Sequence, residues 1–338
     1  MEPAEERKAA HCTQGVPDMN LVFGLLETFL TATGVWGASM PPASGSHQVI
    51  VCGGTEVFIL DVGQQPPKKL WSWKAAERPE LPVNLRDKFE TTSDCKPVDG
   101  GRRVLIVSSG NGVALVERAS GRVVFHATAP NAHSAAMLPG GTLVVASSIA
   151  PDEPGDRLIL FDLRKPGQPL FHTAFASAHG LVWDDGRSLL WAIGGEYLRS
   201  YRLLGSGTGE PRLELTAEYH LPDSDAHDLT PVPASDLLAF TTLHHVWGFD
   251  RSQHSFSLHP QLGNMGDVKS VSTHPVTKQL VFTQAGSGVW WTDTLRFANP
   301  EEQVTLKGER LYKVRWWAAA TSDVGLSSKP VRNGPKTK

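Results

Sequence analysis

The chain has 338 residues and a net charge of −3, with 32 Lys plus Arg against 35 Asp plus Glu. This balance gives no basic character of the kind that nucleic acids or anionic membranes attract, so we expect neither as a partner. The 32 Gly and 24 Pro separate short runs rich in Val, Leu, Thr and Trp. This composition disfavours a helical bundle and favours many short strands joined by tight turns.

Residues 1–46 read as an N-terminal extension. An apolar stretch, 21–38, ends in small residues, with Val35 and Gly37 at plausible cleavage positions. This layout predicts a secretory signal and an extracellular protein. The alternative is an amphipathic helix that caps the domain, because Glu27 interrupts the apolar stretch. The stretch is too short and too interrupted for a good transmembrane helix.

A block of strands and turns recurs from residue 47 onward. Its second strand is an apolar run that appears six times, at 47–54, 103–110, 142–148, 188–194, 237–242 and 279–284. Two further strands follow each run, and the third strand of the last block is predicted at 288–294. A repeat of this length is typical of folds built from one recurring unit, so it determines the fold class.

The opening strands align on one polar residue each: Ser93, His133, His179, His227, Lys269 and Lys313. The intervals are 40, 46, 48, 42 and 44 residues. Four strands repeated at this spacing predict an all-β fold, a six-bladed β-propeller over 47–317. The C-terminal strand 310–317 would complete the first blade and close the ring, which removes exposed sheet edges. Residues 318–338 are predicted to be a disordered tail.

The opening strands of a propeller line its central channel, and we place the aligned row there. Two residues earlier, nearer the mouth, lie Thr91, Asn131, Ser177, Asp225, Asp267 and Leu311. Two residues later lie Cys95, Ala135, Leu181, Leu229, Val271 and Arg315. The channel is therefore predicted to be polar at its mouth and mostly apolar below, like a one-ended pocket.

Three successive blades carry histidine in the aligned row, at His133, His179 and His227. Three converging imidazoles suit a divalent metal such as Zn or Mn. The alternative is that they are channel histidines hydrogen-bonded to water. Calcium is a weaker candidate because it prefers oxygen ligands, and only Asp225 and Asp267 offer carboxylates there.

Cations occupy the other side of the ring, at Lys269, Lys313 and Arg315. Cations near a metal repel it unless an anion lies between them, so the ring implies a ligand with a carboxylate or sulfate. The alternative is that these cations pair with acidic residues, namely Asp225, Asp228, Asp267 or Glu196. The long connection 75–90, which contains Arg86, would wall the site.

The remaining aromatic and thiol residues are assigned to packing. Trp290 and Trp291 fall in a predicted blade strand and are expected in the core. Cys52 and Cys95 can approach each other between the first two blades, either as a disulfide or as two buried thiols. We find no nucleotide-binding glycine loop, metalloprotease motif or nucleophile elbow in the chain.

The strings Asn131-Ala-His-Ser, Ala178-His-Gly and Asp225-Ala-His-Asp resemble those of an uncharacterised group of secreted propeller proteins. More distantly, the three histidines resemble the manganese site of the oligogalacturonate lyases, which are seven-bladed propellers. That resemblance implies a metal held by His133, His179 and His227, with Gln284 as a candidate fourth ligand.

Together these features lead to the hypothesis of a secreted, metal-assisted lyase that acts as a monomer on uronate-containing oligosaccharides. The base would be Lys269, His244 or His245, and hydrolysis would instead pair Glu196 with Asp225 or Asp228. Asn131, Lys313, Arg315 and Arg86 would contact the anionic substrate. The alternative is a non-catalytic propeller that binds a glycan or a protein, since a fold alone does not define a function.

Overall fold

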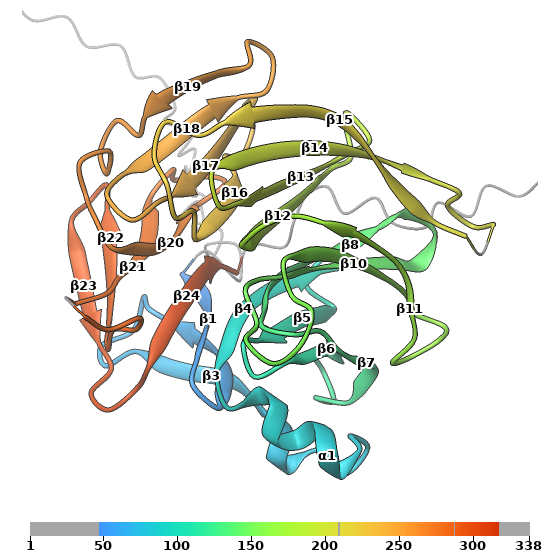
Figure 1. Ribbon diagram of the computed structural model, residues 1–338. Coiled ribbons are helices and arrows are strands. Elements are labelled where there is room, and N and C mark those ends of the chain that lie inside the picture. Colours follow the sequence, from blue (N-terminus) through green and yellow to red (C-terminus); the bar gives the residue numbers. More distant parts are fainter. Residues whose placement is uncertain (1–46, 209, 287, 318–338) are drawn as a thin grey trace, which may run out of the picture. The chain divides into compact units, whose positions relative to one another are not determined.

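The computed structural model describes residues 47–317, apart from residues 209 and 287. The predicted signal segment and spacer (1–46) and the predicted tail (318–338) lie outside the described residues. The described part contains six four-stranded antiparallel sheets arranged around a ring, as Figure 1 shows. This arrangement confirms the predicted six-bladed β-propeller.

The first three blades are listed here from the inner strand outward. The first contains β24 (Leu311–Trp316), β1 (Gln48–Gly53), β2 (Glu56–Asp61) and β3 (Lys68–Lys74). The second contains β4 (Thr92–Val98), β5 (Arg103–Ser108), β6 (Gly112–Glu117) and β7 (Val123–Thr128). The third contains β8 (Ala132–Leu138), β9 (Thr142–Ser147), β10 (Arg157–Asp162) and β11 (Pro169–Ala174).

The last three blades follow the same order. The fourth contains β12 (Ala178–Asp184), β13 (Leu189–Gly194), β14 (Tyr197–Leu204) and β15 (Arg212–His220). The fifth contains β16 (Asp228–Pro231), β17 (Leu237–Thr241), β18 (Val246–Asp250) and β19 (Ser255–Leu258). The sixth contains β20 (Val268–Thr273), β21 (Leu280–Gln284), β22 (Thr294–Ala298) and β23 (Glu302–Thr305).

Within residues 47–317, as far as the structure describes them, helical structure is confined to short turns. Three of them, η1 (Ala75–Glu77), α1 (Val83–Arg86) and η2 (Asp87–Phe89), connect the first two blades, and η3 (Pro139–Gly141) joins β8 to β9. Among the described residues, no helix has the length and apolar character needed to cross a bilayer.

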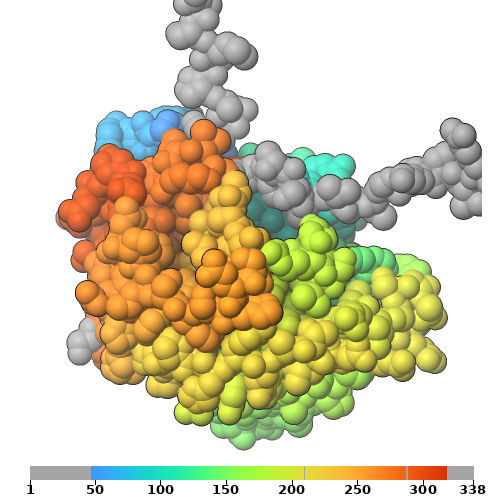
Figure 2. Space-filling view, turned by 90° about the horizontal axis from the view of Figure 1, so that it is seen from above, coloured from blue at the N-terminus to red at the C-terminus, as the bar shows by residue number. Residues whose placement is uncertain are grey.

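The ring closes through the pairing of β24 with β1. The two strands are antiparallel, with Val49 opposite Trp316 and Val51 opposite Val314. Figure 2 shows the blue N-terminal and the red C-terminal residues next to each other on the surface. The closing strand predicted at 310–317 is therefore found, and the first blade combines both ends of the described chain.

The core consists of six apolar clusters, one between each pair of neighbouring blades. Along β1, Ile50 and Cys52 pack toward the second blade, whereas Val49 and Val51 pack toward the sixth. Side chains of a strand alternate between its two faces, and both faces here are covered by a neighbouring blade. This explains why the second strands are continuous apolar runs rather than alternating ones.

The sixth blade differs from the prediction in its third strand. That strand was expected at 288–294, but β22 begins only at Thr294. Trp290 and Trp291 lie in the preceding loop, where 64% and 39% of their surfaces are exposed. The expectation that these two tryptophans belong to the core is wrong, because the apolar run resembles a strand while its side chains remain outside the sheet.

Candidate functional site

An irregularity of one residue recurs near the start of the inner strands. The pairing register with the second strand skips Ser93 in β4, His133 in β8, His179 in β12 and Lys269 in β20. His227 directly precedes β16, and its backbone N–H donates to Thr241 O at 2.9 Å. A β-bulge redirects the side chain of the extra residue, so these residues form one row around the channel.

The row has a different member in the first blade from the one predicted. In β24, Leu311 pairs with Gly53 and Lys313 pairs with Cys52, so Tyr312 is the skipped residue. The sequence alignment had placed Lys313 there because it matched the row by side-chain polarity. The structure shifts this strand by one residue and brings an aromatic side chain with a polar hydroxyl to the row.

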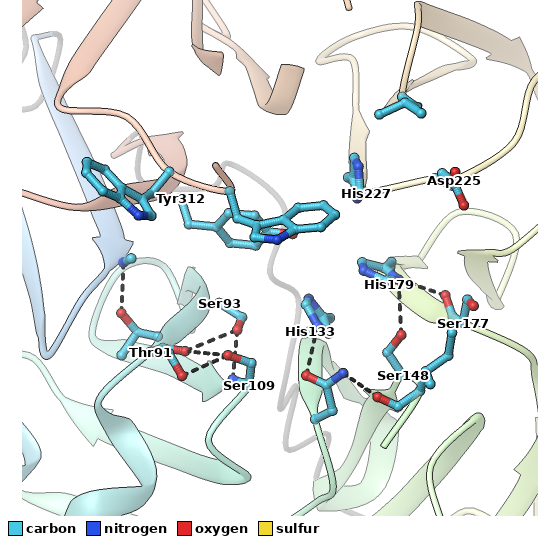
Figure 3. A pocket seen from close by; sticks show the side chains of 18 of the residues that line it. Thr91, Ser93, Ser109, His133, Ser148, Ser177, His179, Asp225, His227 and Tyr312 are labelled. Atoms are coloured by element: carbon cyan, nitrogen blue, oxygen red, sulfur yellow. Dashed lines mark hydrogen bonds between the residues drawn. The ribbon is translucent and has the colours of Figure 1, made fainter. Parts of the chain in front are cut away.

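A pocket of about 660 Å³ opens at this row. Histidine, hydroxyl and aromatic side chains dominate its wall, including Thr91, Ser93, Ser109, His133, Ser148, Ser177, His179, His227, Trp290, Trp291 and Tyr312. Figure 3 shows the three imidazoles at successive positions around the opening, opposite Tyr312. The three histidines lie in register at this opening, as predicted, but much of the wall around them is apolar. We call this cavity the mouth pocket.

A residue with a left-handed backbone conformation lies just before each of four inner strands. Asn131, Ser177, Asp225 and Asp267, each two residues before the row, have φ values of 42°, 48°, 56° and 59°. Asn and Asp tolerate this region better than most residues. The same residues supply partners to the row, since Asn131 Oδ1 lies 3.0 Å from His133 Nε2 and Ser177 O lies 2.8 Å from His179 Nδ1.

All three imidazoles are neutral at ordinary pH. Burial, and then the neighbouring His179, hold the pKa of His133 well below its usual range. Burial lowers the pKa of His179 to about 4, although the Ser177 carbonyl acts in the opposite direction. Burial, together with the Lys269 ammonium, lowers the pKa of His227 to about 2. The row therefore offers hydrogen-bonding groups without charge.

The geometry of the histidines does not fit a metal site. The rings of His133 and His179 lie side by side, with centroids 4.1 Å apart and an interplanar angle of 34°. His227 Nε2 lies 3.1 Å from Lys269 Nζ, so the ammonium occupies the side of this nitrogen where a metal would bind. In the part of the chain that the structure describes, no three His, Cys, Asp or Glu side chains are grouped to hold a metal. Gln284, the predicted fourth ligand, donates to Gly266 O instead.

The predicted acid and base residues are dispersed. Among them only Asp225 lines the mouth pocket. His245 Nδ1 lies 3.0 Å from Asp223 Oδ2, and His244 is exposed beside it. Glu196 is exposed and lies 4.0 Å from His220 Nε2. Of the acid/base pair predicted for hydrolysis, Glu196 and Asp228 do not line the mouth pocket.

Lys269 lies behind the wall of the pocket rather than in it. Its side chain is 2% exposed, and its Nζ lies 3.6 Å from Asp267 Oδ1 and 4.8 Å from the centre of the Trp290 ring. Burial lowers the pKa of Lys269, and Asp267 partly offsets that effect. The ammonium thus supports His227 and Trp290 from the side that faces away from the opening.

The cations predicted to bind substrate have other partners. Arg315 forms hydrogen bonds to both carboxylate oxygens of Asp228, at 2.7 and 2.6 Å, and one to Asp94 at 3.1 Å. Lys313 Nζ is fully buried and lies 3.3 Å from Asp228 Oδ1. Arg86 donates to the backbone oxygens of Leu81 and Pro79, within its own connection.

A buried ionic cluster thus fills the channel beneath the row. It contains Asp94, Lys96, Asp228, Lys313 and Arg315, with Lys96 Nζ 3.3 Å from Asp94 Oδ2. Although burial acts to raise them, the Arg315 charge lowers the pKa values of both carboxyl groups. The expectation of a mostly apolar lower channel is wrong, because Asp94, Asp228 and Lys313, each one residue after the row, join Arg315 and Lys96 there.

Beyond this cluster, a second cavity of about 460 Å³ opens at the opposite ends of the inner strands. Its wall includes Trp183, Pro231 and Trp316 together with the outer side of Arg315. The ionic cluster therefore separates two cavities, one at each end of the channel.

The sequence prediction missed the aromatic part of the mouth pocket. Trp290 and Trp291 come from the loop after β21, and Tyr312 from the shifted inner strand β24. No feature of the sequence marks the first two as exposed, because both faces of a blade strand are buried and an apolar run such as 288–294 is typical of one.

Comparisons with known proteins bear on the fold and the family. The chain is similar to a chain of the crystal structure of a nidogen/laminin complex, with a TM-score of 0.55, 13% identity, and coverage of 79% of this chain and 97% of that chain. It is also similar to a chain of the mitotic checkpoint complex, with a TM-score of 0.48, 13% identity, and coverage of 70% and 68%. At this identity the likeness concerns the fold alone. No curated protein matches the chain.

The sequence itself matches, over residues 55–329, the family described as a family of unknown function (DUF6528). This match includes almost the whole propeller. The protein therefore belongs to the DUF6528 family.

Proposed function

We propose that the protein is a non-catalytic binding propeller whose mouth pocket holds a glycan. The observation that carries this proposal is the pair of solvent-exposed tryptophans, Trp290 and Trp291, at the rim of a pocket whose wall also contains hydroxyl groups and neutral imidazoles beside apolar side chains such as Ile149 and Leu243. Exposed tryptophans offer flat apolar faces of large area, which suit the C–H faces of sugar rings. A few polar groups around such faces fix the orientation of a ligand.

The polar side of the pocket suits ligands with many hydroxyl groups. Ser109, Ser148 and Ser177 contribute to the wall from three different blades. Tyr312 adds an aromatic face to the same wall. A hydroxyl both donates and accepts, and a ring of such groups therefore matches a sugar better than an apolar molecule.

Binding accords with the geometry better than the lyase hypothesis does. The lyase would use a metal, a nearby base and cations that hold the uronate. His227, Lys313 and Arg315, which would supply these, already contact Lys269 or Asp228. A glycan ligand also accords with the secretion that the N-terminal sequence predicts.

The test is a titration of the purified protein against a panel of neutral and acidic oligosaccharides by isothermal calorimetry. We expect at least one to bind, and Trp290→Ala to weaken that binding by at least about tenfold, or about 1.4 kcal/mol. Trp290 is mostly exposed, so its removal leaves the core intact. Trp183→Ala, in the second cavity, is the matched control and should bind as the wild type does. Unchanged binding by Trp290→Ala, or no binding to any member of the panel, would contradict the proposal.

A further inference from the structure

The mouth pocket has an unusual charge distribution for a site first expected to hold an anion. Among its lining residues that the structure describes, Asp225 is the only one with a charged side chain, since the three histidines are neutral. Any ligand in the pocket therefore meets one negative charge and no positive one in the wall.

The nearby cations lie outside the wall of the pocket. Lys269 is buried and contacts His227 and Asp267, and its charge also interacts with Asp225. Lys313 and Arg315 pair with Asp94 and Asp228 within the ionic cluster. Among the described residues, the Asp225 carboxylate itself forms no ion pair or hydrogen bond, and its side chain is exposed at the opening. Figure 3 shows it beside His227 and His179.

The hydrogen bonds of His179 add a second reason for the pocket to prefer a ligand that donates hydrogen bonds. Its Nδ1 lies 2.8 Å from the Ser177 carbonyl, which can only accept, so Nδ1 carries the proton of the neutral ring. The Nε2 atom of the same ring is then an acceptor. An acceptor and a carboxylate side by side both require a ligand that donates.

A ligand carboxylate or sulfate has no proton to donate at neutral pH and is repelled by Asp225. A sugar hydroxyl donates to either acceptor without any charge penalty.

We propose that Asp225 makes the mouth pocket selective for neutral, hydroxyl-rich sugars over uronates and other anionic sugars. This inference rests on the proposed glycan-binding function and reverses the charge preference expected from the sequence. Asp225 acts as a specificity-determining residue: it accepts a hydrogen bond from a ligand hydroxyl and repels ligand anions.

The test compares one neutral oligosaccharide that binds in the panel with its derivative oxidised to a carboxylate at the C6 hydroxyl. Both are titrated into the wild type, Asp225→Asn and Asp267→Asn. We expect the carboxylate derivative to bind the wild type about tenfold more weakly than its neutral parent. Asp225→Asn should reduce this ratio to less than about threefold, since the amide removes the charge and keeps the shape. Asp267→Asn changes the equivalent residue of the next blade, which pairs with Lys269 and does not line the pocket, and should reduce the ratio less than Asp225→Asn does.

The outcomes separate the two proposals. Equal or tighter binding of the carboxylate derivative, or an unchanged ratio in Asp225→Asn, overturns the selectivity while glycan binding still stands. A panel in which only acidic sugars bind also overturns the selectivity alone. If no sugar of either kind binds, the proposed function fails, and the selectivity fails with it.

Discussion

Arg315 in the first blade and Asp228 in the fifth are joined across the channel by two hydrogen bonds of 2.7 and 2.6 Å. The same guanidinium also contacts Asp94 in the second blade. Both carboxylates and the guanidinium are buried. The inner strands are therefore held together by ionic contacts across the axis in addition to the apolar clusters between the blades.

Replacement of Asp228 by Asn should destabilise the protein by about 3–5 kcal/mol, because it leaves Arg315 and Lys313 buried with too little negative charge. Urea unfolding followed by circular dichroism measures this change. Asp152→Asn removes an exposed carboxylate and is the control, with an expected effect below about 0.5 kcal/mol. A loss of less than about 1 kcal/mol in Asp228→Asn would show that the ionic cluster contributes little to stability.

Acid should weaken the fold through the neutral histidines. Between pH 6.5 and about 4, the unfolded chain takes up protons on these imidazoles, while the folded chain, with lowered pKa values, does not. The unfolded state then binds more protons, so the free energy of unfolding falls as the pH falls through this window.

The variant His179→Gln tests this expectation. Each such histidine contributes a slope of up to about 1.4 kcal/mol per pH unit, and the variant should lose one such contribution. Urea unfolding at pH 6.5, 5.5 and 4.5 gives both slopes. Identical slopes in the wild type and the variant would mean that His179 keeps an ordinary pKa in the folded protein.

Closure of the ring depends on a close approach at Gly53. A Cβ atom at this position would lie 2.5 Å from Tyr312 N and closer still to Arg310 O. Both are backbone atoms: Tyr312 is in β24, and Arg310 directly precedes it. Gly53→Ala should therefore lower the free energy of unfolding by about 1–3 kcal/mol. Thermal unfolding measures the effect.

The adjacent glycine provides the control. A Cβ atom at Gly54 would come no closer than 3.9 Å to Arg310, which is an ordinary contact. Gly54→Ala should therefore retain the wild-type melting temperature to within a few degrees. Equal melting temperatures for both variants would contradict the close packing of β24 against β1.

The thiols of Cys52 and Cys95 should resist modification in the native protein. Both are free and buried, and burial raises the pKa of Cys95 well above its usual range. The thiolate is the reactive form, so reaction with iodoacetamide should be slow until the protein unfolds. Peptide mapping by mass spectrometry locates the label. Rapid labelling of either residue at neutral pH would contradict its burial.

The repeat could be predicted from the sequence because each blade needs an apolar second strand covered on both faces. The intervals between Ser93, His133, His179, His227 and Lys269 were sufficient to align the inner strands. The pairing of β24 with β1 followed from the same repeat, since a sheet edge left open at that point would have no partner.

The details of the site could not be predicted from alternation alone. A bulge adds one residue without any marker in the sequence, and it moved Tyr312 into the row in place of Lys313. The bulge at Ser93 likewise places Asp94 within hydrogen-bonding distance of Arg315. Trp290 resembled a strand residue because hydrophobicity does not distinguish a buried ring from an exposed binding surface.

Hydrogen–deuterium exchange with and without a neutral oligosaccharide that binds in the panel tests most directly that the mouth pocket is the binding site. We predict slower exchange in 131–133, 177–179 and 288–293, the segments that line the pocket, and no change in 231–235 at the second cavity. Protection confined to 231–235, or to the outer strands of the blades, would contradict the account.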